Sequence, residues 1–83
     1  MPVVDLFCGC GGLSKGFELA GFDIAAAYDG WDDAVACYNA NFEHDAHVLD
    51  LSDVEAAVPI VMANHPTVII GGPPCQEFSN AGK

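Results

Sequence analysis

The sequence predicts an α/β fold in which strands and helices alternate to build a parallel sheet. Short runs rich in β-branched and aromatic residues alternate with segments whose apolar residues recur at helical spacing. Glycine, proline or acidic residues follow each of the runs and mark where they end. The expected order is βαβαβαβ, with right-handed crossovers and a three-layer arrangement. Because ligands of such sheets bind beyond the carboxyl ends of the strands, the residues there are the candidate functional residues.

The first strand is predicted over residues 2–7 (PVVDLF), and it ends in the glycine cluster of residues 9–12. A short helix is expected over residues 13–20, and Gly21 directly after it is a typical C-terminal stop. Glycines between a strand and a helix let a ligand approach the backbone where a Cβ atom would clash. This loop is therefore the first candidate ligand contact.

The second strand is predicted over residues 22–28 (FDIAAAY), which are apolar and are bounded by the Asp29-Gly30 turn pair. A second helix should follow over residues 31–41, because acidic residues stand in its first turn, where they favour the helix dipole. Its buried face should carry Ala34, Val35 and Tyr38.

A short third strand is expected over residues 46–49. The next helix should lie within residues 52–65 and open with a Ser-x-x-Glu capping box from Ser52 to Glu55. Pro59 should bend or shift that helix, because proline lacks the N–H that a helix interior needs.

The last strand is predicted over residues 67–70 (TVII), and it is followed by two glycines, two prolines, Cys75 and Gln76. Prolines cannot continue strand pairing, so Cys75 should be held in a fixed direction at the mouth of the sheet and exposed to ligand. A chance thiol in a proline-rich turn is the alternative interpretation. The strand itself presents an apolar edge that favours pairing with further polypeptide.

The chain is strongly acidic, with a formal net charge of -10 from 12 acidic and 2 basic residues. Proteins that hold nucleic acid usually neutralise its phosphates with Lys and Arg, so composition argues against DNA binding by this segment alone. An acidic surface is compatible with a cationic ligand such as a sulfonium. No apolar stretch reaches the roughly 20 residues of a membrane helix, and a soluble, cytoplasmic protein is expected.

The cysteines are irregularly spaced and contain no CxxC pair, which predicts free thiols at Cys8, Cys10, Cys37 and Cys75. Cys37 should lie on an apolar helix face. His44 and His47 are expected to be solvated loop residues, because no third donor stands near them. No metal site is predicted.

Residues 5–14 read DLFCGCGGLS, a glycine spacing that meets the G-x-G-x-x-G dinucleotide pattern only in part. A tight turn that binds no ligand is a further alternative. The segment resembles the first motif of the cytosine-5 DNA methyltransferases, and the Pro-Cys-Gln turn resembles their fourth. This resemblance implies a partial Rossmann-like fold of the AdoMet-dependent methyltransferases, with S-adenosyl-L-methionine (AdoMet) as the cofactor.

By this resemblance, Phe7 packs on the adenine end of AdoMet, and the backbone of the glycine loop borders its amino-acid part. Asp29 accepts the ribose hydroxyls; the alternative is that it only begins an Asp-Gly turn. Asp50 matches the acid of the third motif, which accepts from the adenine amino group; a solvated loop acid is its alternative role. The full set implied for the cofactor is Phe7, Gly9, Gly11, Gly12, Leu13, Asp29, Gly30, Asp50, Leu51 and Pro73.

The resemblance also implies the catalytic chemistry. The thiolate of Cys75 would add to C6 of cytosine, so that C5 can take the methyl group, and β-elimination would then release the enzyme. The target base must leave the duplex stack to reach the thiol. Pro74 and Gln76 should shape the base pocket, and Ser79 should begin a loop that closes over DNA.

Residues 1–83 match only the first part of a family catalytic domain, without the later motifs and the recognition domain. DNA methylation, as in bacterial restriction-modification, would therefore require a missing continuation or a complementing polypeptide. A non-catalytic AdoMet- or nucleotide-binding module, a structural remnant and a methyltransferase acting on transfer RNA are the alternatives.

Overall fold

The computed structural model describes residues 1–72 of the chain. The residues predicted to form the nucleophile turn lie outside the described residues, and they are Pro73, Pro74, Cys75, Gln76 and Ser79. Their assignments remain predictions.

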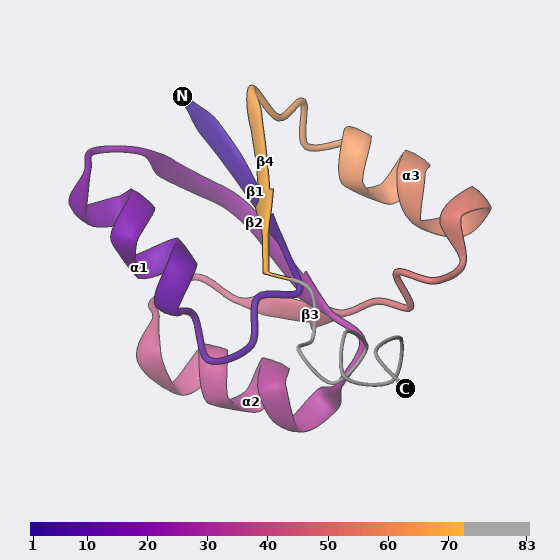
Figure 1. Cartoon of the computed structure of the whole chain (residues 1–83), viewed down its shortest axis with the longest axis horizontal. Coiled ribbons are helices and arrows are strands. Elements are labelled where there is room, and N and C mark those ends of the chain that lie inside the picture. The colour runs from indigo at the N-terminus through magenta and orange to yellow at the C-terminus, as the bar shows by residue number, and fades with distance from the viewer. Residues whose placement is uncertain (73–83) are drawn as a thin grey trace, which may run out of the picture.

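Four parallel strands form one sheet in the order β3-β2-β1-β4 (Figure 1). The strands are β1 (Pro2–Leu6), β2 (Asp23–Asp29), β3 (Ala46–Val48) and β4 (Val68–Gly71). The helices are α1 (Gly12–Leu19), α2 (Asp32–Asn41) and α3 (Val54–Met62). The predicted alternation and parallel sheet are confirmed, and most predicted boundaries differ from the observed ones by only one or two residues.

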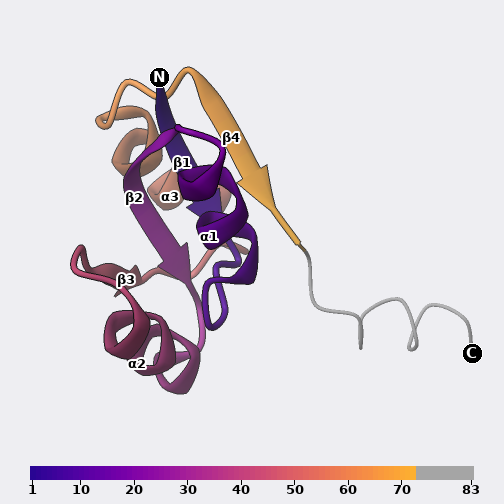
Figure 2. The same cartoon turned by 90° about the vertical axis from the view of Figure 1, so that its left-hand side faces the viewer.

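The helices cover both faces of the sheet, because the crossover from β3 to β4 passes over β2 and β1 while the first two crossovers lie on the other side (Figures 1 and 2). Successive side chains of β2 alternate between these faces. Ala27 packs with Val35 and Tyr38 of α2, whereas Ala26 and Tyr28 pack with the side of α3. The predicted face of α2 is thus confirmed as buried, and the fold has three layers.

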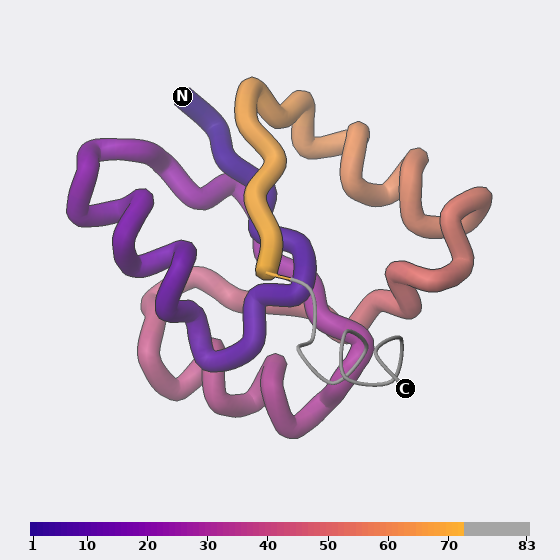
Figure 3. The backbone as a smooth tube through the Cα atoms, in the orientation of Figure 1, coloured from indigo at the N-terminus to yellow at the C-terminus, as the bar shows by residue number. Residues whose placement is uncertain are grey.

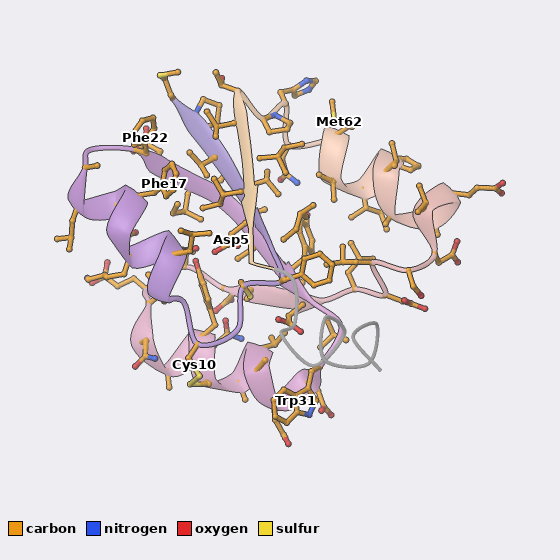
Figure 4. All side chains as sticks on the ribbon, viewed as in Figure 1. Asp5, Cys10, Phe17, Phe22, Trp31 and Met62 are labelled. Atoms are coloured by element: carbon orange, nitrogen blue, oxygen red, sulfur yellow. A yellow bond between two sulfur atoms is a disulfide. The ribbon has the colours of Figure 1, made fainter. Side chains whose placement is uncertain are left out.

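The end of α1 is fixed by a Schellman motif around Gly21, whose φ of 93° lies in the left-handed region. The Gly21 N–H donates to the carbonyl of Glu18, and the Phe22 N–H donates to the carbonyl of Phe17, both at 3.0 Å. The rings of Phe17 and Phe22 supply the accompanying hydrophobic contact, with centroids 5.3 Å apart (Figure 4). The predicted glycine stop is therefore confirmed together with its mechanism.

The predicted capping box of α3 is wrong. Asp53, not Ser52, is the N-cap, and its carboxylate accepts from the Ala56 N–H at 3.3 Å. Ser52 instead donates to Asp50 from both its N–H and its hydroxyl. The helix includes Pro59 and continues to Met62, so this proline does not end it.

The Schellman motif yields a stability prediction. Gly21→Ala should lower the free energy of unfolding by about 1 kcal/mol, because an L side chain is strained at positive φ. The matched control is Gly16→Ala within α1, where an added Cβ meets no atom within 4 Å and the φ is helical. That control should stabilise the chain by roughly 0.5–1 kcal/mol. Urea denaturation followed by circular dichroism measures both, and equal effects of the two substitutions would contradict the assignment of Gly21.

Candidate functional site

The loop that follows β1 folds back over the carboxyl end of β2 (Figure 3). Phe7, Gly9 and Gly11 all have positive φ, of 58°, 53° and 97°, so this loop turns sharply at alternate residues. The Cys8 N–H donates to the carbonyl of Tyr28 at 3.0 Å, and this bond joins the loop to the carboxyl end of β2. The predicted glycine loop is therefore built against the neighbouring strand rather than projecting into solvent.

Asp29 joins the loops that follow β1 and β2. Its Oδ2 accepts from the Gly9 N–H, and its Oδ1 accepts from the Trp31 N–H, both at 3.0 Å. A carboxylate offers about four acceptor positions, so two remain for a further donor. Asp29 thus begins a turn, as in the alternative interpretation, and at the same time holds the glycine loop.

The glycines of this loop differ in what requires them. A Cβ on Gly11 would lie 2.1 Å from Cε1 of Phe42, so close packing against the residues after α2 excludes any side chain there. A Cβ on Gly9 or Gly12 would meet no atom within 4 Å. The open space beside these two backbones is compatible with a bound ligand, whereas Gly11 has a structural role.

The loop that follows β3, the third loop at this edge of the sheet, lies next to Asp29. The Leu49 N–H donates to the Asp29 carbonyl at 3.0 Å, and a Cβ on Gly30 would be 3.6 Å from the Leu49 carbonyl oxygen. Asp50 is exposed, and its Oδ1 accepts from the Ser52 N–H at 3.0 Å and from the Ser52 hydroxyl at 2.5 Å. These two hydrogen bonds lower the pKa of Asp50. Asp50 therefore carries a negative charge at this edge of the sheet.

An apolar cavity of about 260 Å³ opens between α3 and the ends of β1 and β4. It brings together Phe7 and Leu51, two of the residues predicted to contact a cofactor. Its other lining residues are Leu6, Val54, Ala57, Val58, Val61, Met62 and Ile69. Such a lining can cover an apolar or aromatic group. Leu13, another predicted contact, is 44% exposed on α1 and does not line this cavity.

Comparison with known proteins decides the family. The model of the C-5 cytosine-specific DNA methylase family matches residues 1–83. The chain belongs to this family. It is 54% identical to the type II methyltransferase M.HgiDI of Herpetosiphon aurantiacus and 53% identical to M.HindV of Haemophilus influenzae, over the whole chain in each case.

The match covers the chain more fully than it covers the relatives. The chain spans 27% of M.HgiDI, 27% of M.HindV and 66% of M.HgiGI from Herpetosiphon aurantiacus, to which it is 53% identical. A crystal structure described as a prophage-encoded DNA modification methyltransferase of E. coli is 40% identical and superposes with a TM-score of 0.70. That likeness covers 92% of this chain and 23% of the solved one, and it agrees with a partial Rossmann-like fold.

This member of the methylase family also contains a buried polar chain that the sequence did not reveal. Asp5 is fully buried in β1, and its Oδ2 accepts from the Ser14 hydroxyl at 2.5 Å. The Tyr38 hydroxyl donates to the same Ser14 oxygen at 3.0 Å. Because that hydroxyl has one proton, Nε2 of His44, 2.6 Å away, must be the donor to Tyr38. The expectation that His44 is solvated is therefore wrong; the ring is half-buried and partnered.

Burial controls the ionisation of this polar chain. Desolvation raises the pKa of Asp5, and the charge of Asp29 raises it further, while the hydrogen bond from Ser14 opposes the shift. Desolvation also raises the pKa of Tyr38 to about 12. Asp5 Oδ1 is buried without a hydrogen-bond partner among the described residues. These buried hydrogen bonds fasten β1 to α1 and α2. The only signal for them in the sequence was an acid inside an otherwise apolar strand.

The prediction that all four cysteines are free thiols is wrong for two of them. Cys10 of the glycine loop and Cys37 of α2 form a disulfide, with Cα atoms 4.9 Å apart (Figure 4). They are 27 positions apart in sequence, and only the packing of α2 beside the loop brings them together. Cys8 is a buried free thiol, and desolvation and the nearby Asp5 and Asp29 raise its pKa to about 12.

Within residues 1–72, no group of three or more His, Cys, Asp or Glu side chains is arranged to hold a metal ion. None of the helices in this part of the chain is long and apolar enough to cross a membrane.

The buried polar chain predicts a pH-dependent effect of Ser14→Ala. Removing the hydroxyl leaves a buried carboxylate without its hydrogen bond, which should lower the free energy of unfolding by about 1–3 kcal/mol near pH 7. The raised pKa of Asp5 means that the native state takes up its proton more readily than the unfolded chain, so stability from this group decreases as pH rises. The loss should therefore be smaller near pH 4 than near pH 7, because Asp5 takes up its proton as the pH falls and the buried charge disappears.

Urea denaturation at both pH values tests this prediction. Ser52→Ala is the matched control, because the Ser52 hydroxyl makes a bond of the same length, 2.5 Å, to an exposed carboxylate. Its effect should be much smaller than that of Ser14→Ala. A pH-independent effect of Ser14→Ala would contradict the assignment of Asp5 as the group responsible.

Proposed function

We propose that this chain supplies the AdoMet site and the nucleophile of a DNA cytosine-5 methyltransferase whose remaining parts come from further polypeptide. The observation that carries the proposal is the Asp29 carboxylate, which holds the glycine loop at the carboxyl edge of a parallel sheet and keeps free acceptor positions. Membership of the methylase family supports methyl transfer to cytosine as the chemistry.

The described residues fit AdoMet by the chemistry of their groups. The free acceptor positions of Asp29 suit the ribose hydroxyls, and the apolar cavity bordered by Phe7 and Leu51 suits the adenine end. The open backbones at Gly9 and Gly12 suit the amino-acid part, and the ionised Asp50 suits the adenine amino group. Gly11 and Gly30 shape the surrounding loops, the backbone of Leu13 at the start of α1 would border the amino-acid part, and Pro73 is a further contact in this proposal.

Cys75 is the nucleophile in this proposal. When bound, AdoMet supplies the methyl group. The Cys75 thiolate forms a bond to C6 of a flipped cytosine, and the electron pair of the C5–C6 double bond becomes available at C5. After C5 is methylated and loses its proton, the C6–sulfur bond breaks and the thiolate leaves. Pro74 and Gln76 orient the base, and Ser79 begins the segment that closes over DNA.

The scarcity of basic residues supports DNA binding by further polypeptide. Lys15 is the only Lys or Arg among residues 1–72, and Lys83 is the other basic residue of the sequence. Lys15 also lies over the ring of Phe42, 5.9 Å from its centroid. Too few cations are present to neutralise a phosphate backbone. We therefore infer that this segment acts on DNA in the cytoplasm together with the length that the relatives have in addition.

Covalent trapping tests the nucleophile. The chain is incubated with AdoMet and duplex DNA containing 5-fluorocytosine, alone and with a second polypeptide that supplies the rest of a relative's length. We expect a denaturation-resistant adduct at Cys75 in the mixture, because the fluorine cannot leave as the proton does. Cys75→Ser should abolish the adduct and leave AdoMet binding unchanged. No adduct from a folded mixture would contradict the catalytic assignment, and an adduct from the chain alone would contradict the need for further polypeptide.

Asp29→Ala tests the cofactor site. It should lower AdoMet affinity at least about tenfold, because hydrogen bonds to a charged acceptor contribute roughly 1.5–3 kcal/mol. Isothermal titration calorimetry measures the affinity, and circular dichroism confirms that the variant is folded. Asp32→Ala is the matched control, since Asp32 is an exposed acid only three residues away in the first turn of α2. Equal affinities in the two variants would exclude Asp29 from the site.

A further inference from the structure

The disulfide between Cys10 and Cys37 connects the glycine loop to α2. Cys10 is exposed at the tip of the glycine loop, and Cys37 is half-buried in the middle of α2. Without this bond, the tip is joined to α2 by a hydrogen bond from Asn41 Nδ2 to the Cys10 carbonyl at 3.2 Å. The same Asn41 amide lies 3.9 Å from the Cys37 sulfur and can stabilise negative charge on it. The Cys10 sulfur is therefore accessible to a reagent, and the Cys37 sulfur has a hydrogen-bond donor beside it.

We propose that Cys10 and Cys37 form a reversible thiol–disulfide site that reacts with small-molecule disulfides of the glutathione type and, when oxidised, clamps the glycine loop onto α2. Disulfides in reducing compartments are usually transient and redox-sensing, and exposed ones are the labile ones. Cys8, two residues before Cys10, is buried, and its raised pKa of about 12 keeps it protonated. The site therefore discriminates between neighbouring thiols.

The reaction proceeds in two exchanges that balance. The Cys10 thiolate attacks one sulfur of the small-molecule disulfide, which forms a mixed disulfide and releases one small thiolate. The Cys37 thiolate then attacks the Cys10 sulfur, forms the protein disulfide and releases the second small thiolate. Two protein thiols are oxidised, one small disulfide is reduced to two thiols, and an excess of small thiol reverses both steps. Cys10 reacts first because it is the more exposed of the two.

Oxidation should change how freely the glycine loop opens. In the reduced state the loop is held by non-covalent contacts, which are its packing against Phe42 and the hydrogen bonds from Gly9 to Asp29 and from Asn41 to Cys10. A covalent bond to α2 removes open conformations without moving the loop from the observed arrangement. Resting on the proposed function, the clamped loop is preorganised for AdoMet, so oxidation should tighten cofactor binding.

The position of the basic residues gives a direct test of the disulfide. Because Lys15 and Lys83 are the only sites for trypsin, digestion separates residues 1–15, with Cys8 and Cys10, from residues 16–83, with Cys37 and Cys75. The folded chain is equilibrated in mixtures of reduced and oxidised glutathione, its remaining thiols are alkylated, and it is digested without reductant. We expect the two fragments to stay linked under oxidising mixtures and to separate after dithiothreitol.

Variants assign the linkage. Cys8→Ser and Cys75→Ser should still link the fragments, whereas Cys37→Ser should not. Failure of the chain with Cys75→Ser to link at any glutathione ratio, with folding confirmed by circular dichroism, would overturn the proposal. Linkage that persists in Cys37→Ser would assign the disulfide to another pair and would also overturn it.

The clamp is tested separately on the loop. Hydrogen exchange of the Gly9 to Gly12 amides should slow at least tenfold on oxidation in the unmodified chain and stay unchanged in Cys37→Ser. AdoMet affinity should rise several-fold on oxidation in the unmodified chain and should not change in Cys37→Ser. Linked fragments with unchanged exchange would overturn the clamp. Slowed exchange without AdoMet binding in either state would support the redox site and contradict the proposed cofactor function instead.

Discussion

The carboxylate of Asp29 sets the geometry on which the candidate site depends. Parallel strands place their carboxyl ends at one edge, but the loops that leave that edge must still be held together. Asp29 does this by accepting from Gly9 in the first loop and from Trp31 at the start of α2, while its own carbonyl accepts from Leu49 before the third loop. One residue thus connects three consecutive loops, and its carboxylate still has acceptor positions for hydrogen-bond donors of a ligand.

A second constraint acts at the two ends of the glycine loop. Leu6 and Gly12 bound the loop at the end of β1 and the start of α1, and the buried bond between Asp5 and Ser14 joins these same two elements. Within residues 1–72 the Oδ1 atom of this carboxyl has no hydrogen-bond partner, which costs stability, and the bond from Ser14 to Oδ2 offsets part of that cost. The Tyr38 hydroxyl extends the connection to α2. The glycine loop is therefore fixed at both ends and at its tip.

Most of the fold could be predicted because its signals are local. Period-two and helical patterns, the Gly21 stop and the acids after the strands gave the elements and the residues at the edge of the sheet, including Asp29. Two of the misses depend on distant contacts, whereas the cap of α3 depends on a local turn. The Asp5, Ser14 and Tyr38 chain spans sequence separations of 9 and 24 positions, and the Cys10–Cys37 pair spans 27. Periodicity does not encode which faces of two helices meet, and capping by Asp53 rather than Ser52 depends on a turn that Asp50 forms.

The two faces of the sheet differ in how complete they are. On the side of α2, Tyr38 and Val35 are buried, and the hydrogen bonds and the disulfide close the packing around them. On the side of α3, large apolar side chains remain 45–62% exposed, at Val54, Val58, Ile60 and Met62, and Ile69 of the edge strand β4 is 50% exposed. Isolated exposed apolar residues are ordinary, but a contiguous set beside an apolar cavity marks a contact surface. Because Phe7 and Leu51 line that cavity, polypeptide packed against α3 and β4 would also complete the wall around the adenine end of the proposed cofactor site.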